Sequence, residues 1–399
     1  MSISRDSRTF TARWVFPVSG APLANGTITV RGETIESVDA RGVRTADEDL
    51  GNAAIVPGLV NPHTHLDLSG ARGLIPPTDP DHFTDWLRGV IAYRRSRTVA
   101  QTKEDIRAGL AECLKFGTTL IGDIASEGAS WTAVSEAKTR AVVYWELIGL
   151  TAERSRESYS EMLRWQSLQS ATLNCRPALS PHALYSARWA LIQAAARSGL
   201  PNAIHWMESP AEVELIDMKA GPLIPFLQAL GAWEAEQLSN FKYTLAHSSL
   251  HAPKLLLIHA NYQAVDAMIR PNTSIVYCPR THAAFRHHPH PFREFLQRGV
   301  RVCLGTDSLA SNPDLDILAE ARFVHAKYPD FPGDSLLKMI TLSGAEALGW
   351  ANETGSLEPG KSADFVLVPL PNRDASDPHE LLFADHAADR RTMFRGEWR

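Results

Sequence analysis

A buried strand that ends in two closely spaced histidines is the feature that most limits the fold of this chain. Residues 56–60 read Val-Pro-Gly-Leu-Val, and Asn61 and Pro62 lead to His63 and His65. Because alternate side chains of a strand point to the same side, both imidazoles can reach one metal ion. A single histidine at a strand end can instead have a hydrogen-bonded structural role. The pair therefore indicates a metal site only together with further candidate ligands.

Three later apolar runs of strand length also lead to side chains that bind metals or carry protons. His205 ends one run and is followed three residues later by Glu208, His259 ends the next, and Asp307 follows a third. Singly, each has a plainer explanation; Glu208, for example, is also a favourable charge at the start of a helix. Jointly they predict polar groups that converge at the ends of successive strands.

Alternation of strand-length apolar runs with helical stretches such as residues 102–114 predicts an α/β barrel of parallel strands. A barrel places the carboxyl ends of all its strands at one mouth, where barrel enzymes carry their chemistry. Strand-rich segments at 27–38 and 365–368 lie outside this pattern. The barrel strands are expected at 118–121, 141–147, 176–180, 203–205, 255–259, 274–278 and 300–304.

Size and charge exclude several other classes of protein. The 399 residues, 44% of them hydrophobic, suffice for one large catalytic domain and a smaller unit. A formal net charge of −5 argues against a nucleic-acid partner. We see no apolar signal segment and no run of about 18 apolar residues, so we expect a cytoplasmic protein with no membrane partner. Four widely spaced cysteines predict reduced, buried thiols.

These residues resemble the amidohydrolase superfamily, in its branch of aminohydrolases that act on purines, triazines and related heterocycles. The resemblance runs from Asn52 to Phe365 and implies that Glu208 shuttles protons and His259 orients or activates water. His247 ends another apolar run and is the second choice for the role of His259. The resemblance implies one divalent ion, zinc or alternatively iron(II), bound by His63, His65, His205 and Asp307.

The resemblance also implies a (β/α)8 TIM barrel over residues 57–354. Residues 1–56 and 355–399 would then form one composite β-sandwich domain from both ends of the chain. The strand at 176–180 offers no lysine for the carbamate that bridges two metals in other branches of the superfamily. A site with a single metal ion follows.

Four residues are candidates for substrate contacts. His182 lies in a segment that resembles the family's substrate-contacting stretch, although a capped helix start would also explain the segment. Phe83 and Trp86 are expected to form an apolar wall against an aromatic base, with a place in the core as the alternative. Arg280 is the first choice to bind a substrate carboxylate. The other arginines considered for this role are Arg94, Arg95 and Arg286.

Short matches at 65–69, 83–87 and 205–212 resemble aminodeoxyfutalosine deaminases of menaquinone synthesis. Residues 278–282, Cys-Pro-Arg-Thr-His, depart from the Cys-Pro-x-Ser-Asn pattern of many methylthioadenosine and adenosylhomocysteine deaminases. We therefore expect hydroxide, formed from water at the metal, to attack the amino-bearing carbon of a purine-type nucleoside. Ammonia leaves as Glu208 protonates the adjacent ring nitrogen and Asp307 takes the water proton.

Several alternatives stay open at this point. The substrate could be guanine, methylthioadenosine, adenosylhomocysteine or a triazine, and the bond cleaved could be a cyclic amide or a carbon–chlorine bond. An inactive binding homologue is the alternative from another class, although all six candidate catalytic and metal-binding residues are present. The expected partner is a small heterocyclic substrate, and a homodimer is also left open.

Overall fold

The computed structural model describes residues 7–234, 250–384 and 389–399. The chain divides into two compact units. One unit consists of Met1–Pro62, Ala111–Ile121 and Asp316–Arg399, and the other of His63–Leu110 and Gly122–Leu315. The domain boundaries expected at residues 56/57 and 354/355 stay predictions.

Eight strands form one sheet in which neighbours in the chain are also neighbours in space. From the third strand to the eighth, each strand pairs parallel with the next, and the strands are almost entirely buried, as strands covered on both faces must be. The backbone N–H of Asp307 donates to the carbonyl oxygen of His63 at 3.1 Å, so the ends of the first and last strands meet. The predicted (β/α)8 barrel is confirmed. Its strands are β8 (Leu59–Thr64), β9 (Thr118–Ala125), β10 (Arg140–Leu147), β11 (Cys175–Pro181), β12 (Asn202–Trp206), β13 (Leu255–His259), β14 (Thr273–Tyr277) and β15 (Arg301–Leu304).

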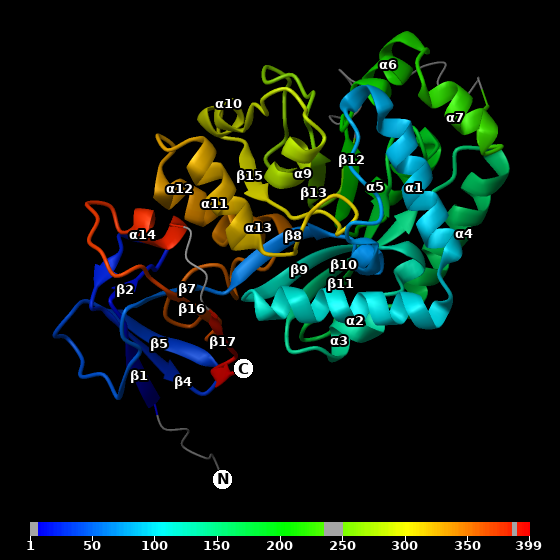
Figure 1. The fold of residues 1–399 in the computed structure, drawn as a ribbon. Helices are drawn as coiled ribbons and strands as arrows, with labels where there is room; N and C mark the ends of the chain where they lie inside the picture. The colour runs from blue at the N-terminus through cyan, green and yellow to red at the C-terminus, as the bar shows by residue number, and fades with distance from the viewer. Residues whose placement is uncertain (1–6, 235–249, 385–388) are drawn as a thin grey trace. The chain divides into compact units, whose positions relative to one another are not determined.

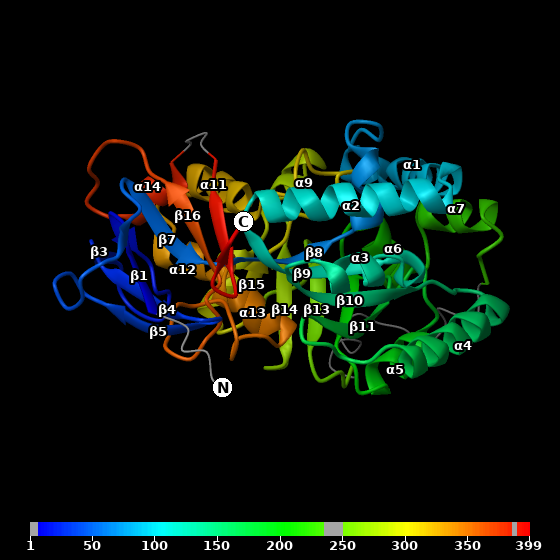
Figure 2. The same ribbon diagram turned by 90° about the horizontal axis from the view of Figure 1, so that it is seen from below.

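Helices follow the barrel strands along the chain, and Figure 2 shows α4 and α5 on the outer side of β10 and β11. Short 3-10 helices occur at η1 (Leu66–Ala71), η2 (Pro80–His82) and η3 (Ser126–Gly128). The described α-helices are α1 (Phe83–Ser96), α2 (Val99–Lys115), α3 (Trp131–Glu136), α4 (Ala152–Leu168), α5 (Trp189–Arg197), α6 (Pro210–Met218), α7 (Leu223–Ala229), α9 (Pro279–Ala284), α10 (Phe292–Gln297), α11 (Ile317–Lys327), α12 (Gly333–Met339), α13 (Leu342–Leu348) and α14 (His379–Phe383).

Strands from both chain ends build two further sheets, with orders β5-β4-β1-β6 and β18-β17-β16-β7-β2-β3. In Figure 1 the C-terminal strand β16 lies beside the N-terminal strand β7, and the two pair antiparallel. β17 pairs with the other edge of β16. Phe10 and Ile28 of one sheet share a buried core with Ile55 and Phe365 of the other. These strands are β1 (Ser7–Thr11), β2 (Trp14–Val15), β3 (Leu23–Ala24), β4 (Thr27–Arg31), β5 (Thr34–Asp39), β6 (Glu48–Asp49), β7 (Ala53–Pro57), β16 (Phe365–Pro369), β17 (Arg391–Phe394) and β18 (Glu397–Trp398).

Two expectations about composition can be compared with the structure. Cys113, Cys175, Cys278 and Cys303 are all buried and outside any disulfide bond, as predicted. Among the helices that the structure describes, none is both long and apolar enough to span a bilayer.

Candidate active site and metal centre

Five polar side chains from four strand ends meet in one buried cluster. Nε2 of His63 lies 3.3 Å from Oδ1 of Asp307, and Nε2 of His65 lies 3.9 Å from the same oxygen. Nε2 of His65 is also 3.3 Å from Nε2 of His205. The ligand atoms of His63, His205 and His259 lie within 4.8 Å of one another. The structure thus brings together the four residues predicted to bind a metal, with His259 beside them.

The backbone turns sharply at the strand ends that carry these side chains. His259, Asp307 and Met207 have φ angles of 66°, 62° and 47°, in the left-handed region that costs a residue with a side chain about 1–3 kcal/mol. The close packing after β15 also favours glycine at position 305, because a Cβ there would lie 2.8 Å from Cγ1 of Val276 and 3.0 Å from the Cβ of His63. Strained turns of this kind concentrate at functional sites.

Hydrogen bonds from neighbouring groups set how the cluster's side chains are oriented. Nδ1 of His205 lies 3.2 Å from the carbonyl oxygen of His182. Donation to that oxygen keeps the proton on Nδ1 and leaves the Nε2 lone pair facing the cluster. Both oxygens of Asp307 are held as well, Oδ1 by the backbone N–H of Ser308 at 2.7 Å and Oδ2 by the hydroxyl of Ser311 at 2.9 Å.

Burial and mutual repulsion keep the imidazoles of His65, His205 and His259 neutral. Burial and the neighbouring histidines hold the pKa of His65 and of His205 well below its ordinary value, and burial lowers the pKa of His259 to about 3. Burial acts to raise the pKa of Asp307, but its hydrogen bond with His63 and the surrounding imidazoles outweigh this and lower it. These three histidines therefore present neutral nitrogen donors, and Asp307 presents an ionised carboxylate.

This donor set fits a divalent cation. The Nε2 atoms of His65 and His205 lie 3.3 Å apart, close enough for both to contact one ion. Nε2 of His259 is buried and has no hydrogen-bond partner among the described residues. Imidazoles with a single carboxylate are typical ligands of catalytic zinc and of iron(II).

Glu208 lies beside the cluster, and the surroundings of its carboxyl group favour the protonated form. Its Oε1 is 3.5 Å from Nε2 of His259. Burial, Asp307 and Glu212 raise the pKa of Glu208 well above its ordinary value. The backbone around it is held, because its N–H donates to Glu212 at 3.0 Å and its carbonyl oxygen accepts from Asn261 at 2.9 Å. A carboxylic acid that keeps its proton near neutrality can act as a general acid.

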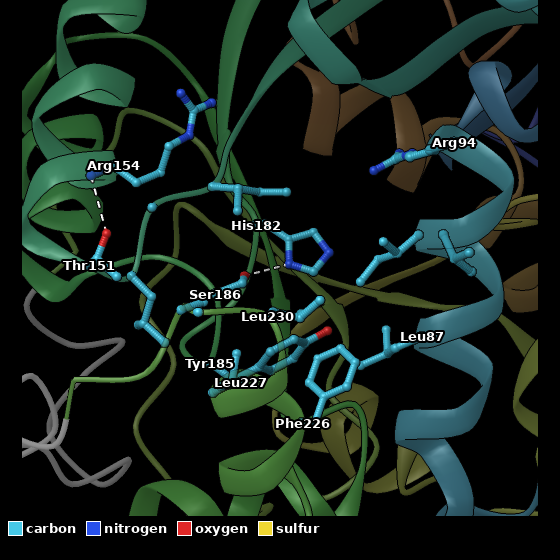
Figure 3. Close-up of a pocket in the computed structure, with 17 residues that line it drawn as sticks. Leu87, Arg94, Thr151, Arg154, His182, Tyr185, Ser186, Phe226, Leu227 and Leu230 are labelled. Atoms are coloured by element: carbon cyan, nitrogen blue, oxygen red, sulfur yellow. Dashed lines mark hydrogen bonds between the residues drawn. The ribbon is translucent and has the colours of Figure 1, made fainter. Parts of the chain in front are cut away.

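His182 connects the cluster to a cavity of about 310 Å³. Its ring centroid lies 4.7 Å from that of His205, and its Nδ1 lies 2.7 Å from the hydroxyl of Ser186. Burial lowers its pKa to about 3, so the ring is neutral. Figure 3 shows His182 and, from α1, Arg94 pointing into this cavity.

Phe83, Trp86 and Arg280, also predicted to contact the substrate, are not among the residues that line this cavity. Phe83 and Trp86 stack on each other with ring centroids 5.8 Å apart, and both are buried. Arg280 donates to both carboxylate oxygens of Asp314, at 2.6 and 3.0 Å. Their roles in substrate binding stay predictions. The alternative residue His247 lies outside the described residues.

The sequence reasoning missed several residues that hold the site in place. Asp123 accepts hydrogen bonds from the hydroxyl of Thr64 at 3.0 Å and from the backbone N–H of Leu66 at 2.9 Å, on either side of His65. Nε2 of His290 lies 2.8 Å from the carbonyl oxygen of His259. No local pattern indicates either contact, because the partners lie far apart in the sequence.

One supporting element does have a sequence signal. The stretch from Ser209 to Glu212 has the Ser-x-x-Glu spacing of a capped helix start. In the structure the hydroxyl of Ser209 accepts from the N–H of Glu212, and Glu212 in turn accepts from the N–H of Glu208. This spacing therefore could have identified Glu212 as the residue that fixes the backbone of Glu208.

A (β/α)8 barrel with a buried histidine and aspartate cluster at its strand ends places the chain among the metal-dependent hydrolases. Comparison with known sequences gives the family. The profile of the Amidohydrolase family matches residues 54–398, and the chain belongs to this family. It is a hydrolase of carbon–nitrogen bonds other than peptide bonds, in cyclic amidines, as the sequence predicted.

Individual relatives are similar over most of their length. The chain is 28% identical, over 94% of its residues, to 5-methylthioadenosine/S-adenosylhomocysteine deaminase of Moorella thermoacetica, of which it covers 89%. It is 26% identical, over 85% of its residues, to aminodeoxyfutalosine deaminase of a Nitratiruptor species, covering 84% of that protein. Helicobacter pylori aminofutalosine deaminase in complex with methylthio-coformycin has the same fold, with a TM-score of 0.83 and 20% identity over 98% of this chain and 100% of that chain.

Proposed function

We propose that this enzyme hydrolytically deaminates an adenosine-like nucleoside. The observation that carries the proposal is the position of Glu208 beside the histidine and aspartate cluster, with Oε1 3.5 Å from Nε2 of His259, where burial and the nearby carboxylates raise its pKa. Cleavage of an amino group from a purine ring needs a proton donor for the ring nitrogen and an acceptor for the proton of water. The site offers one group of each kind.

His63, His65, His205 and Asp307 would hold the metal ion. When bound, a divalent ion supplies Lewis acidity that brings the pKa of a coordinated water toward neutrality. Asp307, whose pKa is lowered, is ionised and accepts a proton from the attacking water. His259, neutral because of its burial, orients that water through Nε2.

Glu208 completes the proton path in this proposal. Its raised pKa keeps a proton on the carboxyl group, and it donates this proton to the ring nitrogen next to the amino-bearing carbon. Water adds to that carbon, the carbon–nitrogen bond to the amino group breaks, and ammonia leaves with the proton from Asp307. The proton that remains on the added hydroxyl group returns to Glu208, so the purine carries a carbonyl group and Glu208 is protonated again.

Aminodeoxyfutalosine is the first candidate substrate. The short sequence matches described above and the relative from Nitratiruptor support it. Methylthioadenosine and adenosylhomocysteine are the second candidates, favoured by the relative from Moorella, which is similar over more of the chain. Zinc is the first choice of metal, with iron(II) as the alternative.

Ammonia release is the direct test. Purified enzyme of known metal content is offered aminodeoxyfutalosine, methylthioadenosine, adenosylhomocysteine, adenosine and guanine, together with a chlorotriazine and a cyclic amide. We expect ammonia from the adenosine derivatives and the highest kcat/KM with aminodeoxyfutalosine. Turnover of the chlorotriazine or the cyclic amide alone would contradict the proposal, and no turnover of any compound by metal-loaded protein would favour a binding homologue.

A further inference from the structure

Thr281 of α9 lies buried against the segment that carries Asp307. The residue is 2% exposed, and its Oγ1 lies 3.1 Å from Oγ of Ser311 and 3.4 Å from the carbonyl oxygen of Thr306. Thr306 and Ser311 both follow β15, one before and one after Asp307 in the chain. The hydroxyl group of Thr281 therefore reaches the turn at Asp307 from a different element of the barrel.

Three polar side chains form a chain of contacts at this turn. Oγ1 of Thr281 lies 3.1 Å from Oγ of Ser311, and Oγ of Ser311 lies 2.9 Å from Oδ2 of Asp307. Ser311 and Asp307 are 4% and 3% exposed, so bulk water hardly competes for these hydrogen bonds. Thr281 thus reaches Asp307 through Ser311.

The direction of these hydrogen bonds follows from the acceptors that surround Ser311. Its single hydroxyl proton has three acceptors within reach. These are Oδ2 of Asp307 at 2.9 Å, Oγ1 of Thr281 at 3.1 Å and the carbonyl oxygen of Ser308 at 3.3 Å. The ionised carboxylate is the strongest acceptor and the nearest, so Ser311 donates to Asp307. The oxygen of Ser311 then accepts from Thr281, and both hydroxyl protons point toward the carboxylate.

This arrangement gives the two carboxylate oxygens of Asp307 different surroundings. Oδ2 accepts from the hydroxyl of Ser311. Oδ1 accepts from the backbone N–H of Ser308 at 2.7 Å and lies 3.3 Å from Nε2 of His63. A hydroxyl group that accepts a hydrogen bond becomes a stronger donor, so Thr281 strengthens the bond from Ser311 to Asp307. The carboxylate is thereby held with Oδ1 toward the predicted metal ligands.

From these contacts we infer that Thr281 is a positioning residue of the metal centre. Its hydroxyl group directs the proton of Ser311 to Oδ2 of Asp307, and this keeps Oδ1 in place for the cation. Hydrogen-bond partners of metal ligands set the orientation and the basicity of those ligands. The inference rests on the proposed role of Asp307 as a metal ligand and adds to the site a residue that acts through another side chain.

Substitutions at position 281 test this role with Co²⁺ as the probe, whose binding to the metal-free full chain is followed through its visible absorption. Thr281→Val keeps the branched shape and removes the hydroxyl group, and we expect Co²⁺ affinity to fall roughly 2- to 10-fold. Thr281→Ser retains the hydroxyl group and should bind Co²⁺ like the unmodified protein. Thr281→Ala removes the same group as the valine variant and covers the case that the latter folds poorly. Thr139→Val is the matched control, since Thr139 is also buried and directly precedes β10, at the amino end of that strand.

Combination with Ser311→Ala separates this role from a general loosening of the fold. Because Thr281 acts through Ser311, Thr281→Val should not lower Co²⁺ affinity further in protein that already carries Ser311→Ala. A further fall of equal size in that background would overturn the inference. Unchanged affinity in Thr281→Val, or an equal fall in Thr281→Ser or Thr139→Val, would overturn it as well.

Asp307→Ala shows which proposal has failed in such a case. If Asp307→Ala loses Co²⁺ while Thr281→Val binds it normally, the role of Thr281 is wrong and the predicted ligand set stands. If Asp307→Ala also binds Co²⁺ normally, the ligand set is wrong and the role of Thr281 falls with it. These measurements need no substrate, so their outcome is independent of the proposed deaminase activity.

Discussion

Glu208 is the residue in which burial and chemistry are most directly linked. Its raised pKa results from burial and from the nearby carboxylates of Asp307 and Glu212. Glu208→Gln keeps the shape of the side chain and removes the transferable proton. We expect the variant to bind as much metal as the unmodified protein and to lose turnover by roughly 10²- to 10⁴-fold. Metal analysis and ammonia release on one preparation check this, and full activity would refute the assigned proton path.

Asp307 is both a predicted metal ligand and the proposed acceptor of the water proton. Its removal should therefore change metal content as well as turnover. It lies 3.3 Å from His63 and is held by Ser308 and Ser311. Asp307→Ala removes the only carboxylate of the predicted ligand set together with the acceptor for the water proton. We expect loss of both metal and turnover. Ser311→Ala is the graded control, and weakening of metal affinity by roughly 10- to 100-fold is expected. Normal metal content in Asp307→Ala would show that the histidines suffice.

At the scale of elements, the sequence indicated the strands and their ends well, since a buried strand leaves a clear apolar run. The run from Leu255 to His259 coincides with β13, and its last residue lies in the cluster. The strand β9 continues to Ala125, past the predicted end at Ile121. Asp123 interrupts the apolar pattern there but is buried, because it accepts hydrogen bonds from Thr64 and Leu66.

The pocket could not be predicted in the same way. Helix α1 has apolar residues on more than one side, and spacing alone does not show which side faces a cavity. The sequence reasoning chose Phe83 and Trp86, whereas Leu87 and Arg94 line the pocket. The partner of Arg280 was equally hidden, because Asp314 lies 34 positions away in the chain.

One buried ion pair within the unit built from both chain ends gives a test of its stability. Nη1 and Nη2 of Arg390 lie 2.7 Å from Oδ1 and Oδ2 of Asp316, and both side chains are buried. Arg390→Ala leaves Asp316 as a buried charge without this partner, which should cost roughly 3–5 kcal/mol in the free energy of unfolding. Arg44, in exposed pairs with Glu36 and Asp39, is the control, with an expected cost of about 0–1 kcal/mol for Arg44→Ala. Similar denaturation midpoints for the two variants would contradict this assignment.

At the scale of the whole molecule, the histidine cluster couples metal binding, pH and stability. A ligand that binds only the folded protein stabilises it, and the cluster exists only in the folded protein. Protons compete with the metal for the same imidazoles, so metal affinity should fall as the pH falls. In metal-free protein this competition is absent, so a histidine variant compared with the unmodified protein reports the contribution of that histidine.

In metal-free protein we expect the free energy of unfolding to decrease as the pH falls below about 6.5. Burial lowers the pKa of His182 and of His259 to about 3, whereas both return to about 6.5 on unfolding. Between these values the unfolded chain binds more protons, so each histidine removes up to about 1.4 kcal/mol of stability per pH unit. Denaturant titrations at several pH values between 7.5 and 4.5 measure the slope, and His182→Asn should make it shallower. An unchanged slope in His182→Asn would mean that the folded protein protonates this ring as readily as the unfolded chain does, and hence that burial does not keep it neutral.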